Sequence, residues 1–343
     1  MSVIREGIAM LVERQGLGEE MAEAAMGEVM RGEATPAQVG AFLTALRMKG
    51  ETVEEVAGCA RAMRAASLKV RTQRTPLVDT CGTGGDRSGT FNISTTVALV
   101  VAGAGVAVAK HGNRSVSSSC GSADLLEALG VKIDLGPEAV GRCIDEVGMG
   151  FLFAPRFHPA MKHAAQPRRE MGVRTIFNIL GPLTNPASAS VQLIGVYSPH
   201  LTDLLARVLL RLGASRAMVV HGDSGLDELS VTGPSRVTRL DGGEITTDYL
   251  DPQGLGLPSA TLEELRGGTA EENAKLTLAV LKGERGPRRD VVLLNAAAAL
   301  VMAGRAADFA EGMAVAAESI DSVRAFKVLG DLARFTQGVG AVS

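Results

Sequence analysis

The segment Asp79–Ser94, DTCGTGGDRSGTFNIS, is the most informative part of the sequence, because an apolar run, LVD, ends there in a glycine-rich turn. Four glycines and five hydroxyl side chains lie within these sixteen residues. We expect a strand before the turn and a helix that begins near Asn92 or Ser94. The amides of a glycine turn and of a helix N-terminus bind anions, so the pattern favours a phosphate site. A tight turn without a ligand is the alternative.

The turn does not match two other phosphate-binding motifs. A Walker loop would need Gly-Lys-Ser/Thr after a second glycine, and in GxGxxG the third glycine would replace Arg87.

A second polar cluster, KHGNRSVSSSCGSAD at Lys110–Asp124, also follows an apolar run. It contains two cations, an asparagine and five serines, and a helix is expected to begin near Ala123. A solvated serine-rich surface loop is the alternative reading. Ligands of parallel sheets bind beyond the carboxyl ends of the strands, so two such loops would form one polyanion pocket.

A third cluster, HGDSGLDELS, places Asp227 and Glu228 after the strand-like run RAMVVHG. Adjacent carboxylates are often ordinary surface charge. Beside two phosphate-type loops, however, they are the hard oxygen ligands that Mg²⁺ uses together with substrate phosphates. The pair is therefore a candidate metal site.

The rest of the chain predicts an α/β fold with a small helical part at its start. Residues 2–67 read as four short amphipathic helices, and residues 269–337 as Ala-rich helices. Strand-like runs alternate with helical stretches, which favours a mostly parallel central sheet covered by helices. These runs are 77–80, 106–110, 149–154, 191–197, 216–222 and 236–240. From His158 we expect a helix that Pro167 ends or kinks, followed by a non-helical exit at GPLTNP.

The composition is that of a globular protein without a polyanionic partner. The 343 residues are 46% hydrophobic and 21% charged, with a net charge of −3, so no general attraction to nucleic acid is expected. The four cysteines are scattered, which argues against a zinc site or a disulfide framework. The sequence has no basic leader followed by an apolar run, and no uninterrupted apolar stretch of membrane-spanning length. We therefore expect a cytoplasmic protein with no membrane partner.

Four motifs, DTCGTGGD, KHGNRSVSS, HPAMK with RTIFNILGPLTNP, and GLDE, occur in this order and spacing. They resemble the motifs of the anthranilate phosphoribosyltransferase family, and the resemblance covers nearly the whole chain. It implies transfer of the 5-phosphoribosyl group from 5-phosphoribosyl 1-diphosphate to anthranilate in tryptophan biosynthesis. It also implies the nucleoside phosphorylase class of fold, a homodimer built through the helical domain, and an active site between two domains. The helical domain would comprise 1–72 and about 160–185, and the α/β domain 73–159 and 186–343.

The resemblance also implies which residues bind each ligand. The phosphoribosyl donor would be bound by Gly82, Gly85, Asp86, Thr90, Asn92, Ile93, Ser94, Thr95, Lys110, the Asn113–Ser118 loop including Arg114, Ser117 and Ser118, and Ser122. Anthranilate would contact Gly82, His111, Asn113 and Arg168, with the Gly181-Pro182 turn along its path. Mg²⁺, as two ions with the donor, would be bound by Ser94, Asp227 and Glu228.

The sequence departs from the family pattern at two places. Ser119-Cys120 stands where many relatives have Lys-Ser, which puts one diphosphate-binding cation in doubt. Pro167 stands where an aliphatic residue is common, which leaves Arg168 and Arg169 as alternatives for the anthranilate carboxylate.

The expected chemistry needs no covalent nucleophile. Negative charge grows on the departing diphosphate, so Mg²⁺, Lys110 and the glycine-turn amides would stabilise the transition state electrostatically. Cys81 and Cys120 are then packing residues. His111 is either a late proton acceptor or a structural histidine. Two other functions remain open, a nucleoside phosphorylase and a non-catalytic relative that binds nucleic acid.

Overall fold

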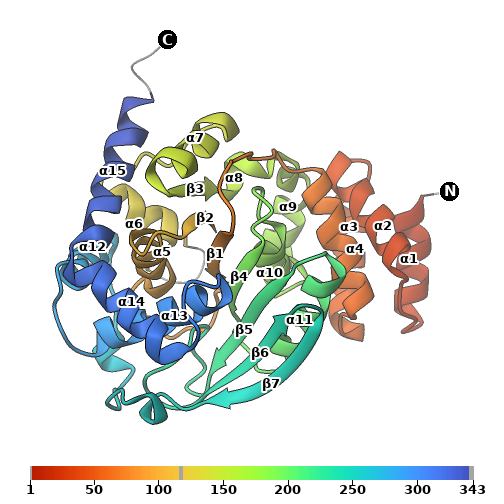
Figure 1. Ribbon diagram of the computed structural model, residues 1–343. Helices are drawn as coiled ribbons and strands as arrows, with labels where there is room; N and C mark the ends of the chain where they lie inside the picture. The colour runs from red at the N-terminus through yellow and green to blue at the C-terminus, as the bar shows by residue number, and fades with distance from the viewer. Residues whose placement is uncertain (1, 116–118, 340–343) are drawn as a thin grey trace.

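The computed structural model describes residues 2–115 and 119–339. Four helices begin the chain, as the sequence predicts: α1 (Val3–Val12), α2 (Glu19–Arg31), α3 (Pro36–Lys49) and α4 (Val53–Ala65). Thr35 and Thr52 cap α3 and α4, because each hydroxyl accepts a hydrogen bond from the amide three residues later. The predicted apolar face of α3 is buried against this bundle, at the right of Figure 1.

A seven-stranded sheet forms the centre of the rest of the chain, in the order β3-β2-β1-β4-β5-β6-β7. The five strands from β3 to β5 are parallel, and β6 and β7 add an antiparallel hairpin at one edge. The strands are β1 (Leu77–Gly82), β2 (Ala107–Gly112), β3 (Met149–Phe153), β4 (Val191–Gly195), β5 (Arg216–Gly222), β6 (Ser235–Asp241) and β7 (Glu244–Leu250).

The sequence predicts six of these strands and misses β7. The residues of β7 are mostly exposed and polar, because the strand lies at the sheet edge. The turn Asp241-Gly242-Gly243 before it was the available signal, since Asp-Gly is typical of hairpins.

Helices cover both faces of the sheet, which gives three layers (Figure 1). Alternate residues of one strand enter different hydrophobic cores, as Leu193 and Ile194 of β4 do. One face packs against the C-terminal helices and α5 (Ile93–Gly103), and the other against α11 (Leu201–Arg211), which also contacts α4. The C-terminal helices are α12 (Ala270–Leu281), α13 (Pro287–Met302), α14 (Phe309–Asp321) and α15 (Arg324–Gly338).

The remaining helices connect the strands. After β2 come α6 (Ser122–Ala128) and α7 (Pro137–Val147), and after β3 come α8 (Ala154–Phe157), the 3-10 turn η1 (Pro159–Met161), α9 (Lys162–Met171), α10 (Phe177–Leu180) and η2 (Gly181–Thr184). Two further 3-10 turns, η3 (Gln253–Leu255) and η4 (Glu263–Leu265), follow β7.

In the segment after His158, a helix end at Pro167 and a fully non-helical exit are wrong. The helix α9 does not end at Pro167 but continues to Met171, and Gly172, with φ of 62°, terminates it. Packing explains this, because Pro167 is buried and α9 contacts α2 and α3. The GPLTNP exit begins as the 3-10 turn η2 rather than as non-helical chain. Within the described residues, no helix is long and apolar enough to cross a membrane.

Candidate active site

The glycine turn after β1 contacts the loop after β5. The sequence predicts this contact, because both segments follow the carboxyl ends of parallel strands. The amide of Gly84 donates a hydrogen bond of 2.8 Å to Oδ2 of Asp227. A Cβ added at Gly82 would lie 2.6 Å from the same oxygen, and one added at Gly195 would overlap the Asp227 carbonyl. Glycine at both positions therefore lets the Asp227 loop lie directly on the ends of β1 and β4.

Three carboxylates, those of Asp86, Asp227 and Glu228, lie close enough to interact beside this turn. Burial, and then repulsion from Asp86, raise the pKa of Asp227 to about 7. Burial and the charge of Asp227 raise the pKa of Glu228 well above its ordinary value. Oδ2 of Asp86 is buried and has no hydrogen-bond partner in the protein. Neighbouring acids that repel one another, of which Glu228 is buried and Asp86 and Asp227 are half-buried, fit a bound cation.

The protein alone supplies few ligands for that cation. In residues 2–115 and 119–339, no group of three or more His, Cys, Asp or Glu side chains is arranged to hold a metal ion. This fits Mg²⁺, which commonly uses one or two carboxylates and completes its shell with water and substrate phosphates.

Lys110 lies under the site rather than on its surface. Its side chain is 1% exposed, and Nζ donates to the Thr80 carbonyl and, at 3.4 Å, to Oγ of Ser94. Burial lowers the pKa of Lys110, whereas the negative charge of Asp79 opposes this shift. Asp79 is itself held by Nδ2 of Asn185 at 2.7 Å.

The first turn of α5 presents the predicted hydroxyl groups. Oγ1 of Thr95 is buried and has no partner in the protein, and Ile93 is buried beside it. Thr90 lies before the helix, where its hydroxyl is 3.3 Å from that of Ser88. This end of α5 therefore keeps one unused hydroxyl, that of Thr95.

Asn92 connects three segments instead of leaving its amide free. Its Nδ2 donates to the Cys120 carbonyl at 3.1 Å, and its Oδ1 accepts from Nδ2 of Asn273 at 2.9 Å. The glycine turn, the 110–124 loop and α12 are fixed to one another in this way. Asn273, from α12, was not predicted from the sequence.

The 110–124 loop directs Arg114 toward a helix. Its guanidinium contacts Asp124 at 2.9 Å and Glu127 at 2.5 Å, and these bonds raise its pKa. Oγ of Ser122 donates to the Asn113 carbonyl at 3.3 Å, which closes the loop on itself. Ser117 and Ser118 lie outside the described residues.

Arg168 is a cation without an acidic partner. Its guanidinium lies 4.8 Å from the centre of the Phe177 ring, and burial lowers its pKa. Within the described residues, no ion pair is formed by Arg168. The neighbouring Arg169 is exposed. This geometry favours Arg168 over Arg169 as the partly buried carboxylate partner.

His111 is held as a neutral imidazole. Burial, followed by the nearby His158, lowers its pKa to about 3, while a hydrogen bond with the Gly181 backbone opposes the shift. The two rings are 5.1 Å apart, and Nε2 of each is buried without a partner. A neutral ring nitrogen that lacks a donor is able to accept a proton or a hydrogen bond.

Arg174 is the second residue that was not predicted from the sequence. Its Nη2 donates to the Gly85 carbonyl, and its guanidinium lies 4.2 Å from the centre of the Tyr197 ring. The residue stands in the RTIFNILGPLTNP motif, but no spacing rule connects it with the glycine turn.

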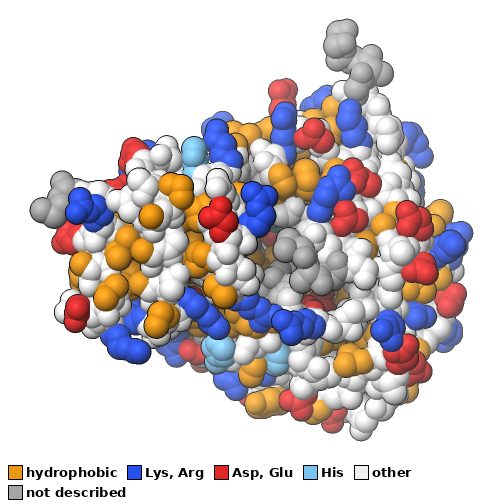
Figure 2. Space-filling view, turned by 180° about the vertical axis from the view of Figure 1, so that it is seen from behind, with side chains coloured by type: hydrophobic (Ala, Val, Ile, Leu, Met, Phe, Trp, Pro, Cys, Tyr) orange, Lys and Arg blue, Asp and Glu red, His pale blue; other side chains and the backbone are white. Residues whose placement is uncertain are grey.

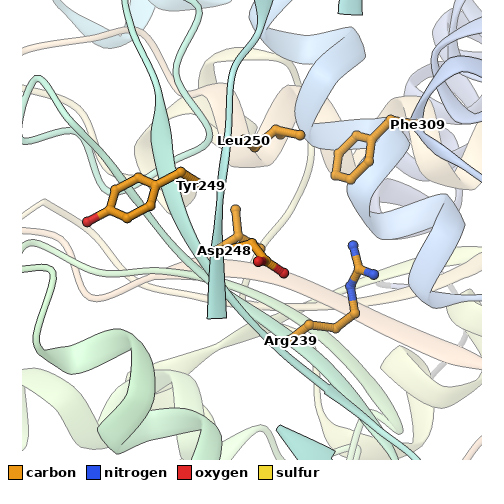
Figure 3. Close-up of a pocket in the computed structure, with 6 residues that line it drawn as sticks. Arg239, Asp248, Tyr249, Leu250 and Phe309 are labelled. Carbon is orange, nitrogen blue, oxygen red and sulfur yellow. The ribbon is translucent and has the colours of Figure 1, made fainter. Parts of the chain in front are cut away.

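A hollow at the sheet edge is not the substrate site. It lies between the β6–β7 hairpin and the start of α14, where Figure 3 shows Arg239, Asp248 and Phe309 around it. Its volume is about 60 Å³. Ligand pockets usually enclose about 300–1,000 Å³, so the hollow is too small for a sugar phosphate.

Comparison with known proteins agrees with this architecture. Residues 74–326 match the α/β domain of the glycosyl transferase family, and residues 5–67 match its helical bundle domain. The anthranilate phosphoribosyltransferase of Moorella thermoacetica is 61% identical over 93% of this chain and 94% of its own length. The crystal structure of the Thermus thermophilus enzyme covers 98% of this chain and 100% of its own, with a TM-score of 0.92 and 48% identity.

The Saccharomyces cerevisiae enzyme is similar at greater sequence distance. Its structure in complex with PRPP and Mg has a TM-score of 0.90, 28% identity and 98% coverage of both chains. Its structure in complex with 4-fluoroanthranilate has a TM-score of 0.88, with the same identity and coverage.

The fold and the site thus define a glycosyltransferase with a helical bundle and an α/β domain. The chain belongs to the anthranilate phosphoribosyltransferase family. It is an enzyme that transfers the 5-phosphoribosyl group of 5-phosphoribosyl 1-diphosphate to the amine of anthranilate in tryptophan biosynthesis. This finding decides among the three functions that the sequence left open.

Proposed function

We propose that the transfer takes place where the glycine turn, the first turn of α5 and the acidic pair Asp227-Glu228 meet. One observation carries this assignment: the half-buried Asp86 and Asp227 and the buried Glu228 form an acidic cluster next to main-chain and hydroxyl groups suited to anions. Mg²⁺ would reduce the repulsion between the acidic cluster and a negatively charged diphosphate, because it binds both carboxylates and phosphates. The complex of the yeast enzyme with PRPP and Mg supports the same combination of ligands.

The metal is assigned to Ser94, Asp227 and Glu228, with two ions bound together with the donor. When bound, Mg²⁺ supplies Lewis-acid stabilisation of the departing diphosphate. Lys110 supports this site from the protein interior. Its Nζ donates to Oγ of Ser94 at 3.4 Å, and its positive charge partly opposes the rise in the pKa of Glu228. Lys110 thus orients and balances these ligands.

The phosphoribosyl donor is assigned to the glycine turn, α5 and the loop after β2. The proposed contacts are those of Gly82, Gly85, Asp86, Thr90, Asn92, Ile93, Ser94, Thr95, Lys110, Asn113, Arg114, Ser117, Ser118 and Ser122. The unpartnered hydroxyl of Thr95 supports a polar ligand at the helix N-terminus. Asn92 and Arg114 act by holding loops in place, because both side chains are already bonded within the protein.

Anthranilate is assigned to Gly82, His111, Asn113 and Arg168, along the Gly181-Pro182 turn. Arg168 would bind the carboxylate through its planar guanidinium, which can form two parallel hydrogen bonds. The 4-fluoroanthranilate complex of the yeast enzyme supports a ligand of this kind. An aromatic amine is mostly unprotonated at neutral pH, so orientation matters more than a strong base.

The chemistry proceeds without a covalent nucleophile. Burial raises the pKa of the Cys81 thiol well above its ordinary value, and burial also raises that of Cys120. Both cysteines therefore stay protonated and unreactive near neutral pH. His111 remains neutral, and because its pKa is lowered to about 3 its free ring nitrogen can accept a hydrogen bond but is a weak base.

The assembly and surroundings of the enzyme are also proposals. We propose a cytoplasmic homodimer that contacts its copy through a helical domain of 1–72 and about 160–185, with no nucleic-acid or membrane partner. Figure 2 shows hydrophobic side chains gathered over the lobe of α1–α4, and Val12 and Met48 are 65% and 70% exposed. Burying such side chains in a symmetric contact would be favourable. Sedimentation of the wild-type protein and of Met48→Glu tests this contact.

Calorimetric titration with 5-phosphoribosyl 1-diphosphate tests the site assignment. The proposal predicts binding that requires Mg²⁺ in the wild type and is weakened by Asp227→Asn. Equal affinity with and without Mg²⁺ would contradict it.

A further inference from the structure

Arg174 connects the end of α9 with the glycine turn. It lies two residues after Gly172, which terminates α9, and its Nη2 donates to the Gly85 carbonyl. Its guanidinium stacks 4.2 Å from the centre of the Tyr197 ring. Within residues 2–115 and 119–339, no carboxylate forms an ion pair with Arg174. In the described part of the chain, the Arg174 cation is therefore held at the turn by a carbonyl and an aromatic ring, without a carboxylate.

Tyr197, whose ring stacks on Arg174, is bound to the glycine turn through its main chain. The amide of Tyr197 donates to Oγ1 of Thr83 at 3.1 Å, and the Thr83 amide donates to the Gly195 carbonyl at 2.9 Å. On its other side, the turn is held by the bond from Gly84 to Asp227. Arg174 and Asp227 thus bind two peptide units of the same turn, Gly85–Asp86 and Thr83–Gly84, which are separated by one unit.

The hydrogen bond from Arg174 to the Gly85 carbonyl fixes the direction of the Asp86 amide. In a trans peptide unit the C=O and N–H groups point in opposite directions, so the position of the Gly85 carbonyl sets that of the Asp86 N–H. Gly85 has φ of 77°, and a glycine can adopt several backbone conformations at low cost. Because Gly85 has no side chain to restrict its backbone, the hydrogen bond from Arg174 selects one of these conformations.

We infer that Arg174 is a positioning residue that orients the glycine-turn amides for the diphosphate of the donor. The inference rests on the proposed assignment of the donor to this turn. Arg174, which follows α9, is thereby assigned to the donor side of the site. Arg168, which lies within α9, is assigned to the anthranilate side. Arg174 acts through the main chain, and its charge adds to the attraction for the diphosphate.

Steady-state kinetics of Arg174→Met and Arg174→Lys test the inference. Loss of a charged hydrogen bond costs about 1.5–3 kcal/mol, so Arg174→Met should raise KM for the donor about 10-fold or more. Its KM for anthranilate and its unfolding temperature should stay near those of the wild type. Arg174→Lys should restore part of the donor affinity. Arg305→Met serves as the control, because Arg305 is exposed.

Two further measurements separate this inference from the proposed function. Binding of inorganic diphosphate with Mg²⁺, followed by calorimetry, should weaken in Arg174→Met and to a smaller extent in Tyr197→Leu, which keeps the Tyr197 amide. Unchanged diphosphate binding in Arg174→Met would overturn the inference even if the wild type is fully active. A wild type that binds diphosphate but transfers nothing would overturn the proposed function and leave the Arg174 comparison valid. Equal increases of both KM values in Arg174→Met would also contradict a specific role at the donor side.

Discussion

The Gly84 amide donates a hydrogen bond of 2.8 Å to Oδ2 of Asp227, and this bond joins the loops after β1 and β5. The carboxylate is wedged against Gly82, where a Cβ would lie 2.6 Å from the same oxygen. The Asp227 carboxylate can therefore take this position only because Gly82, at the end of β1, has no side chain. This relationship leads to the first prediction.

Gly82→Ala should displace Asp227 and raise the Mg²⁺ concentration needed for half-maximal rate. A displacement of about 1 Å at a reacting site can cost about 100-fold in rate, so kcat should also fall by up to this factor. Gly330→Ala in α15 is the control, because an added Cβ there meets nothing within 4 Å. A Gly82→Ala enzyme with a normal Mg²⁺ titration would contradict the role of this contact.

The Asp227 carboxyl should make the effect of Mg²⁺ on stability depend on pH. Its pKa rises from 3.8 to about 7 on folding, so its favourable contribution is present below about pH 4 and is lost as the pH rises through 7. Mg²⁺ binds the ionised form, and it should therefore raise the unfolding temperature more at pH 8 than at pH 5.5. Asp227→Asn should reduce this difference in a calorimetric scan. An equal Mg²⁺ effect at both pH values would contradict the prediction.

Arg168→Ala should raise KM for anthranilate by about 10-fold to 100-fold, because a charged hydrogen bond contributes about 1.5–3 kcal/mol. KM for the phosphoribosyl donor should change little. Arg169→Ala, which removes an exposed neighbour, should have a smaller effect. If Arg169→Ala has the larger effect, the anthranilate assignment belongs to Arg169.

Val323→Asn should stabilise the protein without altering activity. Val323 is 56% exposed and has φ of 56°, a left-handed conformation that costs a β-branched residue about 1–2 kcal/mol. Asparagine tolerates this conformation better, so urea unfolding should show a gain of about 1 kcal/mol. Val12→Asn, at a helical position that is 65% exposed, should not stabilise. A loss of stability in Val323→Asn would contradict the strain argument.

The parallel part of the sheet could be predicted because its strands are short apolar runs between turn signals. The glycine turn and the acidic pair could be placed together for the same reason, since loops at the carboxyl ends of parallel strands are neighbours. The edge strand β7 could not be found from apolar alternation, because its side chains face water. Propensity also failed at Pro167, where burial of the ring against neighbouring helices outweighs the lost main-chain hydrogen bond.

The direction of individual side chains was beyond the sequence. Arg114 is a cation in a phosphate-type loop, yet Asp124 and Glu127 on α6 bind its guanidinium. Arg174 reaches across 89 positions of sequence to the Gly85 carbonyl. The Arg174 contact depends on where the segment after α9 lies relative to the glycine turn, and local sequence patterns carry no information about that placement.

The loss of anthranilate fluorescence on mixing with 5-phosphoribosyl 1-diphosphate and Mg²⁺ tests the central claim most directly. We expect a rapid loss of fluorescence that EDTA abolishes and that Asp227→Asn with Glu228→Gln slows by about 100-fold or more. A flat trace from correctly folded wild-type protein, or a loss that proceeds equally in EDTA, would contradict it.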